Sequence, residues 1–439
     1  MEILIKASQL ILSLSILVIL HELGHFIPAK LFKTRVEKFY LFFDPWFSLF
    51  KFKKGDTEYG IGWLPLGGYV KISGMIDESM DKEQMNKEPE SWEFRSKPAW
   101  QRLIIMLGGV TVNIILGFLI YSLVLFAWGK EYLPVQNAKY GVICDSLMHQ
   151  YGFQDGDKIL AVGDSYIETF SDIPKAIILD KQRNIQIERN GEEMMVSLPN
   201  NMDEILLDNN VKVLFSPLLP FVIDTVLAGA PAADSDLKKE DRIIGINDVA
   251  TPYFQSFVSE IGKYKGEAVA IVVNRGGEDV KVQVNVGEDG KIGVGNKSIE
   301  HFFEINRQEY GFFEAFPAGI EHGINVLSGY VESIKFIFTA AGAKQMGGFG
   351  AIGSLFSPVW DWHNFWNMTA FISIMLAFMN VLPIPALDGG HVVFLLYEIV
   401  TRRKPNEKVL EYAQITGMVI LFALFVFANG NDLFKLFSK

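Results

Sequence analysis

Cysteine is almost absent from this sequence, and its scarcity excludes disulfide stabilisation. The single residue, Cys144, cannot form a disulfide within the chain. A basic excess is also missing, because 51 acidic residues against 40 basic ones give a formal net charge of −11. That balance argues against nucleic acid as a partner. No small-residue cleavage site follows the first apolar run, so we expect no cleavable signal peptide.

Apolar and aromatic residues, by contrast, are abundant. Aromatic side chains make up 13% of the 439 residues, and 35 of these side chains are phenylalanine. Such a composition is more typical of a membrane protein than of a soluble enzyme. Because 21% of the residues are charged, a sizeable part of the chain must nevertheless lie in water. The length leaves room for two or three domains.

Four segments are apolar enough to span a bilayer: residues 8–32, 103–128, 366–399 and 415–427. The third is interrupted by prolines and glycines, and the fourth is shorter than the ~20 residues of a full span. The sequence therefore predicts a polytopic α-helical protein with four transmembrane helices in a lipid bilayer.

Basic residues flank these spans unevenly. They gather after the first span, before the second, and between the third and fourth: Lys30, Lys33, Arg35 and Lys38; Arg95, Lys97 and Arg102; Arg402, Arg403, Lys404 and Lys408. All three clusters fall on one side if the spans alternate, and the positive-inside rule assigns that side to the cytoplasm. We therefore expect a multi-pass protein of the inner (cytoplasmic) membrane. Both termini and the long segment from residue 129 to about residue 364 are expected outside the cytoplasm.

The first span carries a pattern typical of a metal site, HELGH at residues 21–25. On a helix, His21 and His25 lie one turn apart on the same face and can bind one metal ion. Glu22 can then reach a water on that metal and take its proton. A chance occurrence of the pattern is the competing interpretation. Histidine is scarce, however, with seven in the chain, and charged groups inside a bilayer are costly unless they are paired or functional.

A catalytic zinc site usually has three protein ligands, so one more is needed. Asp388 is the favoured candidate, because it lies in the interrupted third span, within NVLPIPALDGGHV at residues 380–392. His391 is the rival, although a helix that restarts after Gly390 would turn it aside. Non-helical backbone at membrane depth is tolerated only where it is buried in protein or lines a watery cavity. The segment therefore also predicts a water path.

Two further segments of the membrane region each allow two interpretations. Residues 60–74 (GIGWLPLGGYVKISG) predict a hairpin or bulged β-ribbon, either packed at the surface or offering a strand edge to an extended peptide. In the second span, Gly109, Asn113 and Gly117 recur every four residues. This stripe favours close helix packing, with a role of Asn113 in a site as the less favoured alternative. Residues 75–92 are expected to form a loop.

The outer segment contains a weak internal repeat. VICDSLMHQYGFQDGDKILAVGD, from Val142, resembles VIDTVLAGAPAADSDLKKEDRIIGIND, from Val222. Each copy leads into a short helix signal and a β-rich run, at residues 184–198 and 268–286. Two modules of about 85 residues, each resembling a PDZ domain, are the simplest account. PDZ folds take up peptides by strand addition, but here we favour gating over the binding of extracytoplasmic peptides.

Two segments lie between this repeat and the third span. Residues 312–340 have helical periodicity and can lie along a membrane surface. Residues 345–353 (QMGGFGAIG) are expected to form a glycine-rich loop. The loop lacks the lysine of a phosphate cradle, so nucleotide binding is excluded.

Together these motifs resemble the site-2 protease family of intramembrane zinc metalloproteases, and most of all its RseP-like branch with tandem PDZ domains. The resemblance rests on HELGH in the first span, PLGGYVK at residues 65–71, the two PDZ-like modules and NVLPIPALDGG, in the family's order. It implies one Zn2+ per chain, held by His21, His25 and Asp388. It also implies Glu22 as the catalytic base.

The resemblance further implies a substrate and the residues that hold it. Members of the family cut single-pass membrane proteins inside the membrane, for example to release a sigma factor from its membrane anchor or to clear signal-peptide remnants. Asn380 would hold the substrate, and Gly67, Gly68 and Tyr69 would lie on a β-ribbon that meets it. This chain departs from the family pattern in three places: FFDP at residues 42–45, GFGAIG at residues 348–353, and Glu240-Asp241 of the second module, where Gly-Asp is usual.

The predicted organisation has five parts. They are residues 1–128, with two spans, HELGH and a cytoplasmic-side β-ribbon; residues 129–215 and 216–300, two extracytoplasmic PDZ-like α+β domains; residues 301–365, a helical linker; and residues 366–439, with the last two spans and LDGG. The predicted function is an intramembrane zinc metalloprotease. A non-catalytic, membrane-anchored PDZ scaffold is the alternative, but it leaves HELGH and LDGG unexplained. A metalloprotease acting on soluble peptides would need a site outside the bilayer core.

Overall fold

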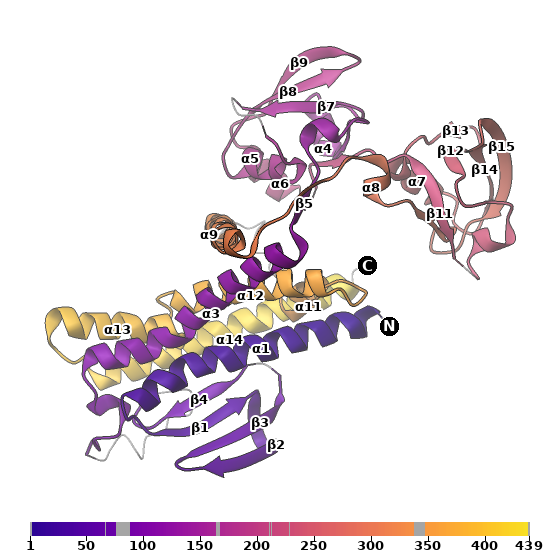
Figure 1. The fold of residues 1–439 in the computed structure, drawn as a ribbon. Helices are drawn as coiled ribbons and strands as arrows, with labels where there is room; N and C mark the ends of the chain where they lie inside the picture. The colour runs from indigo at the N-terminus through magenta and orange to yellow at the C-terminus, as the bar shows by residue number, and fades with distance from the viewer. Residues whose placement is uncertain are drawn as a thin grey trace. The chain divides into compact units, whose positions relative to one another are not determined.

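The structure, a computed structural model, describes residues 2–65, 67–75, 88–163, 167–209, 211, 213–227, 229–337 and 347–437. Of the segments discussed above, residues 66, 76–87, 164, 228, 338–340 and 345–346 lie outside this set. The chain forms two compact units, Met1–Gly129 with Glu309–Lys439, and Lys130–Gln308. The first contains long helices and one sheet, and the second contains short helices and several small sheets (Figure 1).

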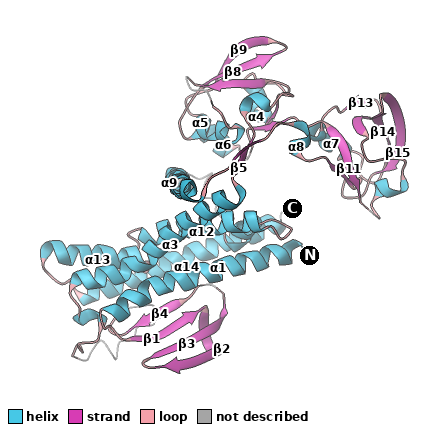
Figure 2. Ribbon diagram, viewed as in Figure 1, coloured by secondary structure: helices cyan, strands magenta, loops and turns pink. Residues whose placement is uncertain are grey.

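Four long helices dominate the first unit: α1 (Glu2–Leu31), α3 (Ala99–Trp128), α12 (Trp362–Val381) and α14 (Glu407–Phe437). Within the described part of the chain, these are the helices long and apolar enough to cross a membrane, so the predicted number of spans is confirmed. Their axes run alongside one another (Figure 2). The fourth prediction was too short, because α14 continues through polar residues at both ends and reaches 31 residues.

The third predicted span is divided where its prolines and glycines interrupt it. Helix α12 ends at Val381, and a second helix, α13 (Asp388–Thr401), begins after six intervening residues. Pro383 and Pro385 cannot donate the hydrogen bonds of a continuing helix. Ala386 has a φ of +78°, which reverses the course of the backbone just before Asp388.

Helix α3 is the centre of this unit and packs against α1, α12, α13 and α9 (Phe312–Ile337). Glycines set the closest approaches. A Cβ on Gly24 of α1 would lie 2.6 Å from the carbonyl carbon of Gly108 on α3. A Cβ on Gly319 of α9 would lie 2.5 Å from the Cα of Ser122, also on α3. The helices therefore touch backbone to backbone, as small residues allow in membranes.

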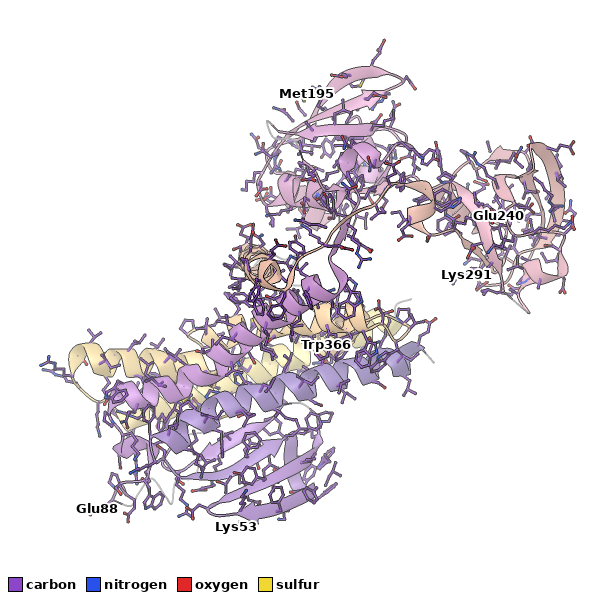
Figure 3. All side chains as sticks on the ribbon, in the orientation of Figure 1. Lys53, Glu88, Met195, Glu240, Lys291 and Trp366 are labelled. Carbon is purple, nitrogen blue, oxygen red and sulfur yellow. The ribbon has the colours of Figure 1, made fainter. Side chains whose placement is uncertain are left out.

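The segment that connects α1 to α3 in the sequence contains a four-stranded sheet. Its strands are β1 (Val36–Leu41), β2 (Phe43–Lys54), β3 (Thr57–Leu64) and β4 (Tyr69–Ile72), in the order β2-β3-β1-β4. Residues 60–74 contribute to strands β3 and β4, as the predicted β-ribbon requires, but the hairpin alternative is wrong because β1 lies between these two strands. Strand β4 is an edge of the sheet and lies alongside α1, whereas Lys53 of β2 lies on the side away from the helices (Figure 3).

The glycine-rich loop predicted before the third span is also wrong. Residues Phe349–Ser354 form the short helix α11. Side chains of α14 accept its first backbone N–H groups: Asp432 Oδ2 lies 2.9 Å from Gly348 N and 3.0 Å from Ala351 N, and Asn429 Oδ1 lies 3.2 Å from Phe349 N. These acceptors lie about 80 residues away in the sequence, so local composition could not reveal the helix.

The second unit contains two large hydrophobic cores and a smaller buried cluster of Leu133, Ala138, Phe302 and Phe303. Around the first are β6 (Val142–Cys144), α4 (Ser146–Gln150), β7 (Lys158–Val162), α5 (Ile173–Ile178), β8 (Asn184–Arg189), β9 (Glu192–Ser197), α6 (Met202–Asp208) and β10 (Phe215–Pro217). Around the second are β11 (Phe221–Val226), β12 (Arg242–Ile246), β13 (Val249–Ala250), α7 (Phe254–Ile261), β14 (Ala268–Arg275), β15 (Glu278–Asn285) and β16 (Val294–Asn296). The unit also includes α8 (Ile299–Phe302) and the paired strands β5 (Lys130–Tyr132) and β17 (Asn306–Gln308).

The same kind of Asp–Arg ion pair occurs in the strands around each of these two cores. Asp157, just before β7, accepts two hydrogen bonds of 2.7 Å from Arg189 at the end of β8. Asp241, just before β12, accepts two of 2.7 Å from Arg275 at the end of β14. In the sequence repeat, DKIL at residues 157–160 aligns with DRII at residues 241–244. The two copies of the repeat therefore place equivalent carboxylates against equivalent strands.

Candidate metal centre

Helix α1 brings two imidazoles to one face. His21 and His25 are one helical turn apart, and their ring centroids are 4.9 Å apart with the rings nearly perpendicular. His25 is buried, with 7% of its surface exposed. Gly109 of α3 lies directly behind both rings, where a Cβ would come within 2.6 Å of His21 Cε1. The absence of a side chain at Gly109 therefore makes room for the imidazoles.

Asp388 comes to the same point from the first residue of α13. The two glycines that follow it allow this placement. A Cβ on Gly390 would lie 2.6 Å from the carbonyl oxygen of Ile384, and one on Gly389 would collide with the backbone at the end of α12. The helix can therefore begin directly against the preceding turn, at Asp388 and not after Gly390 as expected.

Three potential ligand atoms form an almost equilateral triangle. The Nε2 atoms of His21 and His25 are 3.3 Å apart. Asp388 Oδ2 lies 3.4 Å from the first and 3.3 Å from the second. At Zn–ligand distances of about 2.0–2.1 Å, tetrahedral ligands lie about 3.3–3.4 Å from one another. The triangle thus has the dimensions of one face of a zinc tetrahedron, with the fourth position open.

The carboxylate itself also fits a bound cation. Asp388 Oδ2 is buried and has no hydrogen-bond partner among the described residues. A buried carboxylate oxygen without a partner is costly unless it binds a cation. In the described part of the chain, His21, His25 and Asp388 form the cluster of side chains close enough to hold one metal ion. The rival candidate His391 lines the same cavity but does not belong to that cluster.

Each histidine has a second contact behind the metal-facing atom. His25 Nδ1–H donates to the carbonyl oxygen of Ile105, 2.8 Å away. His21 Nδ1 lies 3.2 Å from the amide of Asn113, and its Nε2 lies 3.4 Å from the amide of Asn380. The sequence favoured a packing role for Asn113, but the structure brings this residue to the site. Its spacing of one turn from Gly109 was the signal that could have identified it.

The candidate centre opens into a cavity of about 930 Å³. Every residue predicted to act at the site lines it: His21, Glu22, His25, Gly67, Gly68, Tyr69, Asn380 and Asp388. This volume lies within the usual range for a ligand-binding cavity. Residues from α1, the sheet, α12 and α13 therefore meet at one place, although they are far apart in the sequence.

Sequence reasoning missed one carboxylate of this cavity, Asp44. Tyr69 O–H donates to Asp44 Oδ1 at 2.8 Å, and the rings of Phe43 and Tyr69 stack with centroids 5.9 Å apart. Burial and the hydrogen bond to Asp44 raise the pKa of Tyr69. Phe43 and Asp44 belong to FFDP, so this departure from the family pattern lies directly against Tyr69.

Comparison with known proteins agrees with this geometry. The chain is 28% identical over 447 residues to a Treponema pallidum protein provisionally named a zinc metalloprotease, covering 97% of this chain and 98% of that protein. It is 27% identical over 467 residues to the regulator of sigma E protease of Haemophilus influenzae (99% and 100%). It is 25% identical over 445 residues to the metalloprotease MmpA of Caulobacter vibrioides (98% and 96%). The model of peptidase family M50 matches residues 9–424. The chain therefore belongs to peptidase family M50, the site-2 protease family that its motifs resemble.

Proposed function

We propose that this chain is an intramembrane zinc metalloprotease that cleaves the transmembrane segments of single-pass membrane proteins. Release of a membrane-anchored regulator and clearance of signal-peptide remnants are reactions of this kind. The carrying observation is that His21, His25 and Asp388 meet on a cavity that also contains Glu22, within a unit of four membrane-length helices. Membership of peptidase family M50 supports the same chemistry.

In this proposal His21 and His25 bind one Zn2+ through Nε2, and Asp388 binds it through Oδ2. The triangle of these atoms supports the assignment, and so does the lack of a hydrogen-bond partner for Asp388 Oδ2 among the described residues. A zinc ion bound there would acidify a coordinated water and polarise the scissile carbonyl. Asp388 would also offset part of the positive charge of the ion at membrane depth.

Glu22 is the proposed general base. It follows His21 directly on α1 and lines the same cavity as the three ligands. Its carboxylate takes a proton from the attacking water, so that the oxygen can bond to the peptide carbon. The same carboxyl then gives that proton to the departing amine when the C–N bond breaks. One carboxylate therefore serves both halves of the reaction and returns to its starting state.

The substrate is proposed to bind as an added strand on β4. An amide inside a transmembrane helix has its carbonyl hydrogen-bonded, so the helix must unwind before attack. Strand β4 is an edge of its sheet, and an extended peptide can pair with such an edge. Gly68 supports the placement, because its missing Cβ would lie 3.5 Å from Glu22 Cγ. Gly67, Gly68 and Tyr69 would thus hold the unwound segment beside the base.

Asn380 is proposed to hold the substrate from the opposite side. It comes from the end of α12, and its Nδ2 lies 3.4 Å from His21 Nε2, next to the three ligand atoms. An amide N–H at this position can donate to the carbonyl oxygen of the scissile peptide. Such donors stabilise the negative charge that develops on that oxygen.

The second unit is proposed to comprise two PDZ-like modules, residues 129–215 and 216–300, on the extracytoplasmic side. Their separate hydrophobic cores and equivalent Asp–Arg pairs support two related modules. The basic clusters near the spans support the orientation and an inner-membrane location. We propose that the modules limit access by size, and that extracytoplasmic peptides are their possible ligands in a secondary role.

Glu22→Gln tests the central claim. In the full chain, in detergent or liposomes with a single-pass model substrate, we expect cleavage to fall by about 10²–10⁴-fold. The zinc content should stay at about one per chain, because the three ligands remain. Cleavage at the parent rate would contradict the role of Glu22 as the base, and a parent protein that does not cleave the substrate would favour the scaffold alternative.

Asp388→Asn and His391→Ala form a matched pair for the third ligand. The first keeps the side-chain shape but removes the charge, so zinc binding and cleavage should both fall. The second changes a cavity residue outside the ligand cluster, so its effect should be milder. A normal Asp388→Asn protease together with an inactive His391→Ala protein would show that the ligand has been misassigned.

A further inference from the structure

We propose that Asn113 is a positioning residue that fixes the tautomer and ring orientation of His21 by accepting a hydrogen bond from its Nδ1–H. The inference rests on the proposed role of His21 as a zinc ligand. It assigns to the second spanning helix a direct part in the metal centre, through a residue that holds a ligand without binding the metal.

Among the described residues, the side chain of Asn113 has one hydrogen-bonding contact, which is with His21. It is 1% exposed and lies on α3 one turn after Gly109, the residue behind the two imidazoles. Its Nδ2 lies 3.2 Å from His21 Nδ1. Its Oδ1 is buried and has no hydrogen-bond partner among the described residues. One end of the amide thus faces the histidine, and the other end is unsatisfied.

A metal-bound His21 would provide a hydrogen-bond donor for the unsatisfied Asn113 Oδ1. His21 directs Nε2 toward His25 and Asp388, so Nε2 is its ligand atom and must be unprotonated. The single proton of the neutral ring then resides on Nδ1, which becomes a donor. An amide N–H facing that donor would repel it. A half-turn of the Asn113 amide presents Oδ1 to Nδ1–H and removes the unsatisfied acceptor in the same step.

His25 provides an internal parallel. Its Nδ1–H already donates to a pure acceptor, the carbonyl oxygen of Ile105, on the same helix α3. Asn113 lies eight residues, about two turns, after Ile105 on α3. The two histidines that these residues face are one turn apart on α1. Helix α3 thus offers one acceptor to each imidazole. Metal-binding histidines usually have such an outer partner, which fixes the tautomer and raises ligand basicity.

The backbone at Asn113 is also held in place. Ser373 of α12 donates its Oγ–H to the carbonyl oxygen of Asn113 over 2.7 Å, and the Ser373 side chain is fully buried. This contact involves the backbone of Asn113 and not its side-chain amide. Ser373 therefore offers a control that disturbs the same helix contact without changing the group that faces His21.

The test measures zinc affinity, by competition with a chelator, in the detergent-solubilised full chain. Asn113→Asp keeps an acceptor and should bind zinc within a few-fold of the parent. Asn113→Leu removes the acceptor and should weaken binding by about 10–100-fold. Ser373→Ala should leave zinc affinity within about twofold. Where Asn113→Leu does not yield folded protein, Asn113→Ala takes its place with the same expectation.

The outcomes separate this inference from the proposed function. If Asn113→Asp loses zinc as strongly as Asn113→Leu, the amide acts as a donor and the inference is overturned. If all variants bind zinc with equal affinity and only the melting temperature of the zinc-free protein falls, Asn113 has a packing role alone. This result also overturns the inference. A parent protein that binds no zinc overturns the proposed function instead.

Discussion

At the scale of single residues, the metal centre depends on a glycine as much as on its ligands. The rings of His21 and His25 occupy the space that a side chain at Gly109 would need. A Cβ there would come within 2.6 Å of His21 Cε1 and 2.8 Å of His21 Nδ1. Two spanning helices can therefore hold both imidazoles between them only while this position has no side chain.

Gly109→Ala should lower zinc affinity by roughly 10–100-fold, comparable to the loss of an outer-shell contact. The added methyl group would displace both rings from the positions in which they face Asp388, and cleavage should fall with metal content. Chelator competition and zinc analysis of the purified protein measure the effect.

Gly117→Ala is the matched control, on the same helix and also closely packed. A Cβ there would meet the side chain of Ile374 and not a ligand. We expect lower thermal stability but unchanged zinc affinity. Equal loss of zinc in both variants would mean that any disturbance of α3 suffices, against the specific role of Gly109.

Residues of the site differed in how well the sequence could reveal them. His21, Glu22 and His25 were predictable because helical periodicity alone brings them together. Asp388 was favoured because few metal-binding groups occur in the spans. Asn113 could not be distinguished from a packing residue, because its role depends on what faces it from α1.

At the scale of elements, the paired Asp–Arg contacts are the best-defined electrostatic feature of the second unit. Asp241 has 1% of its surface exposed and is hydrogen-bonded by Arg275. Burial raises the pKa of Asp241, but the hydrogen bonds from Arg275 and from the backbone N–H of Lys238 lower it by more. The net pKa therefore lies below the ordinary value of about 3.9.

A depressed carboxyl pKa makes a stabilising contribution that is present above the unfolded-state pKa and is lost as the pH falls through the folded-state pKa. Asp241→Asn should therefore destabilise the segment Lys130–Gln308 at pH 7, by about 1.5–3 kcal/mol for lost hydrogen bonds to a charged group. The difference from the parent should shrink steadily below about pH 4. Urea unfolding of the segment at several pH values measures it, and a difference independent of pH would contradict the assignment.

Elements also mark the limit of prediction from sequence. The spanning helices and the β-rich character of residues 60–74 follow from local patterns. The order β2-β3-β1-β4 does not follow from them, because β3 and β4 both pair with β1 and not with each other. The sequence predicts a loop where helix α11 forms, because the side chains that accept hydrogen bonds from its first N–H groups come from α14.

At the scale of the whole molecule, orientation in the membrane is the property on which the proposed function depends. A reporter fused near Asn200, in the second unit, should be extracytoplasmic. One fused near Lys404, between α13 and α14, should be cytoplasmic. The expectation follows from the three basic clusters beside the spans. Alkaline phosphatase and green fluorescent protein fusions measure it, and the reversed pattern would place the modules inside the cell.

The distance along the chain between the metal ligands has a consequence for biogenesis. His21 and His25 leave the ribosome early, in the first spanning helix, whereas Asp388 follows several hundred residues later. At usual rates of translation this interval is roughly 20–70 s. During that time the nascent chain has only two of the three proposed zinc ligands. Because Asp388 is synthesised late, we expect that the protease becomes active only after this residue has been added. Chains truncated before Asp388 should have no proteolytic activity.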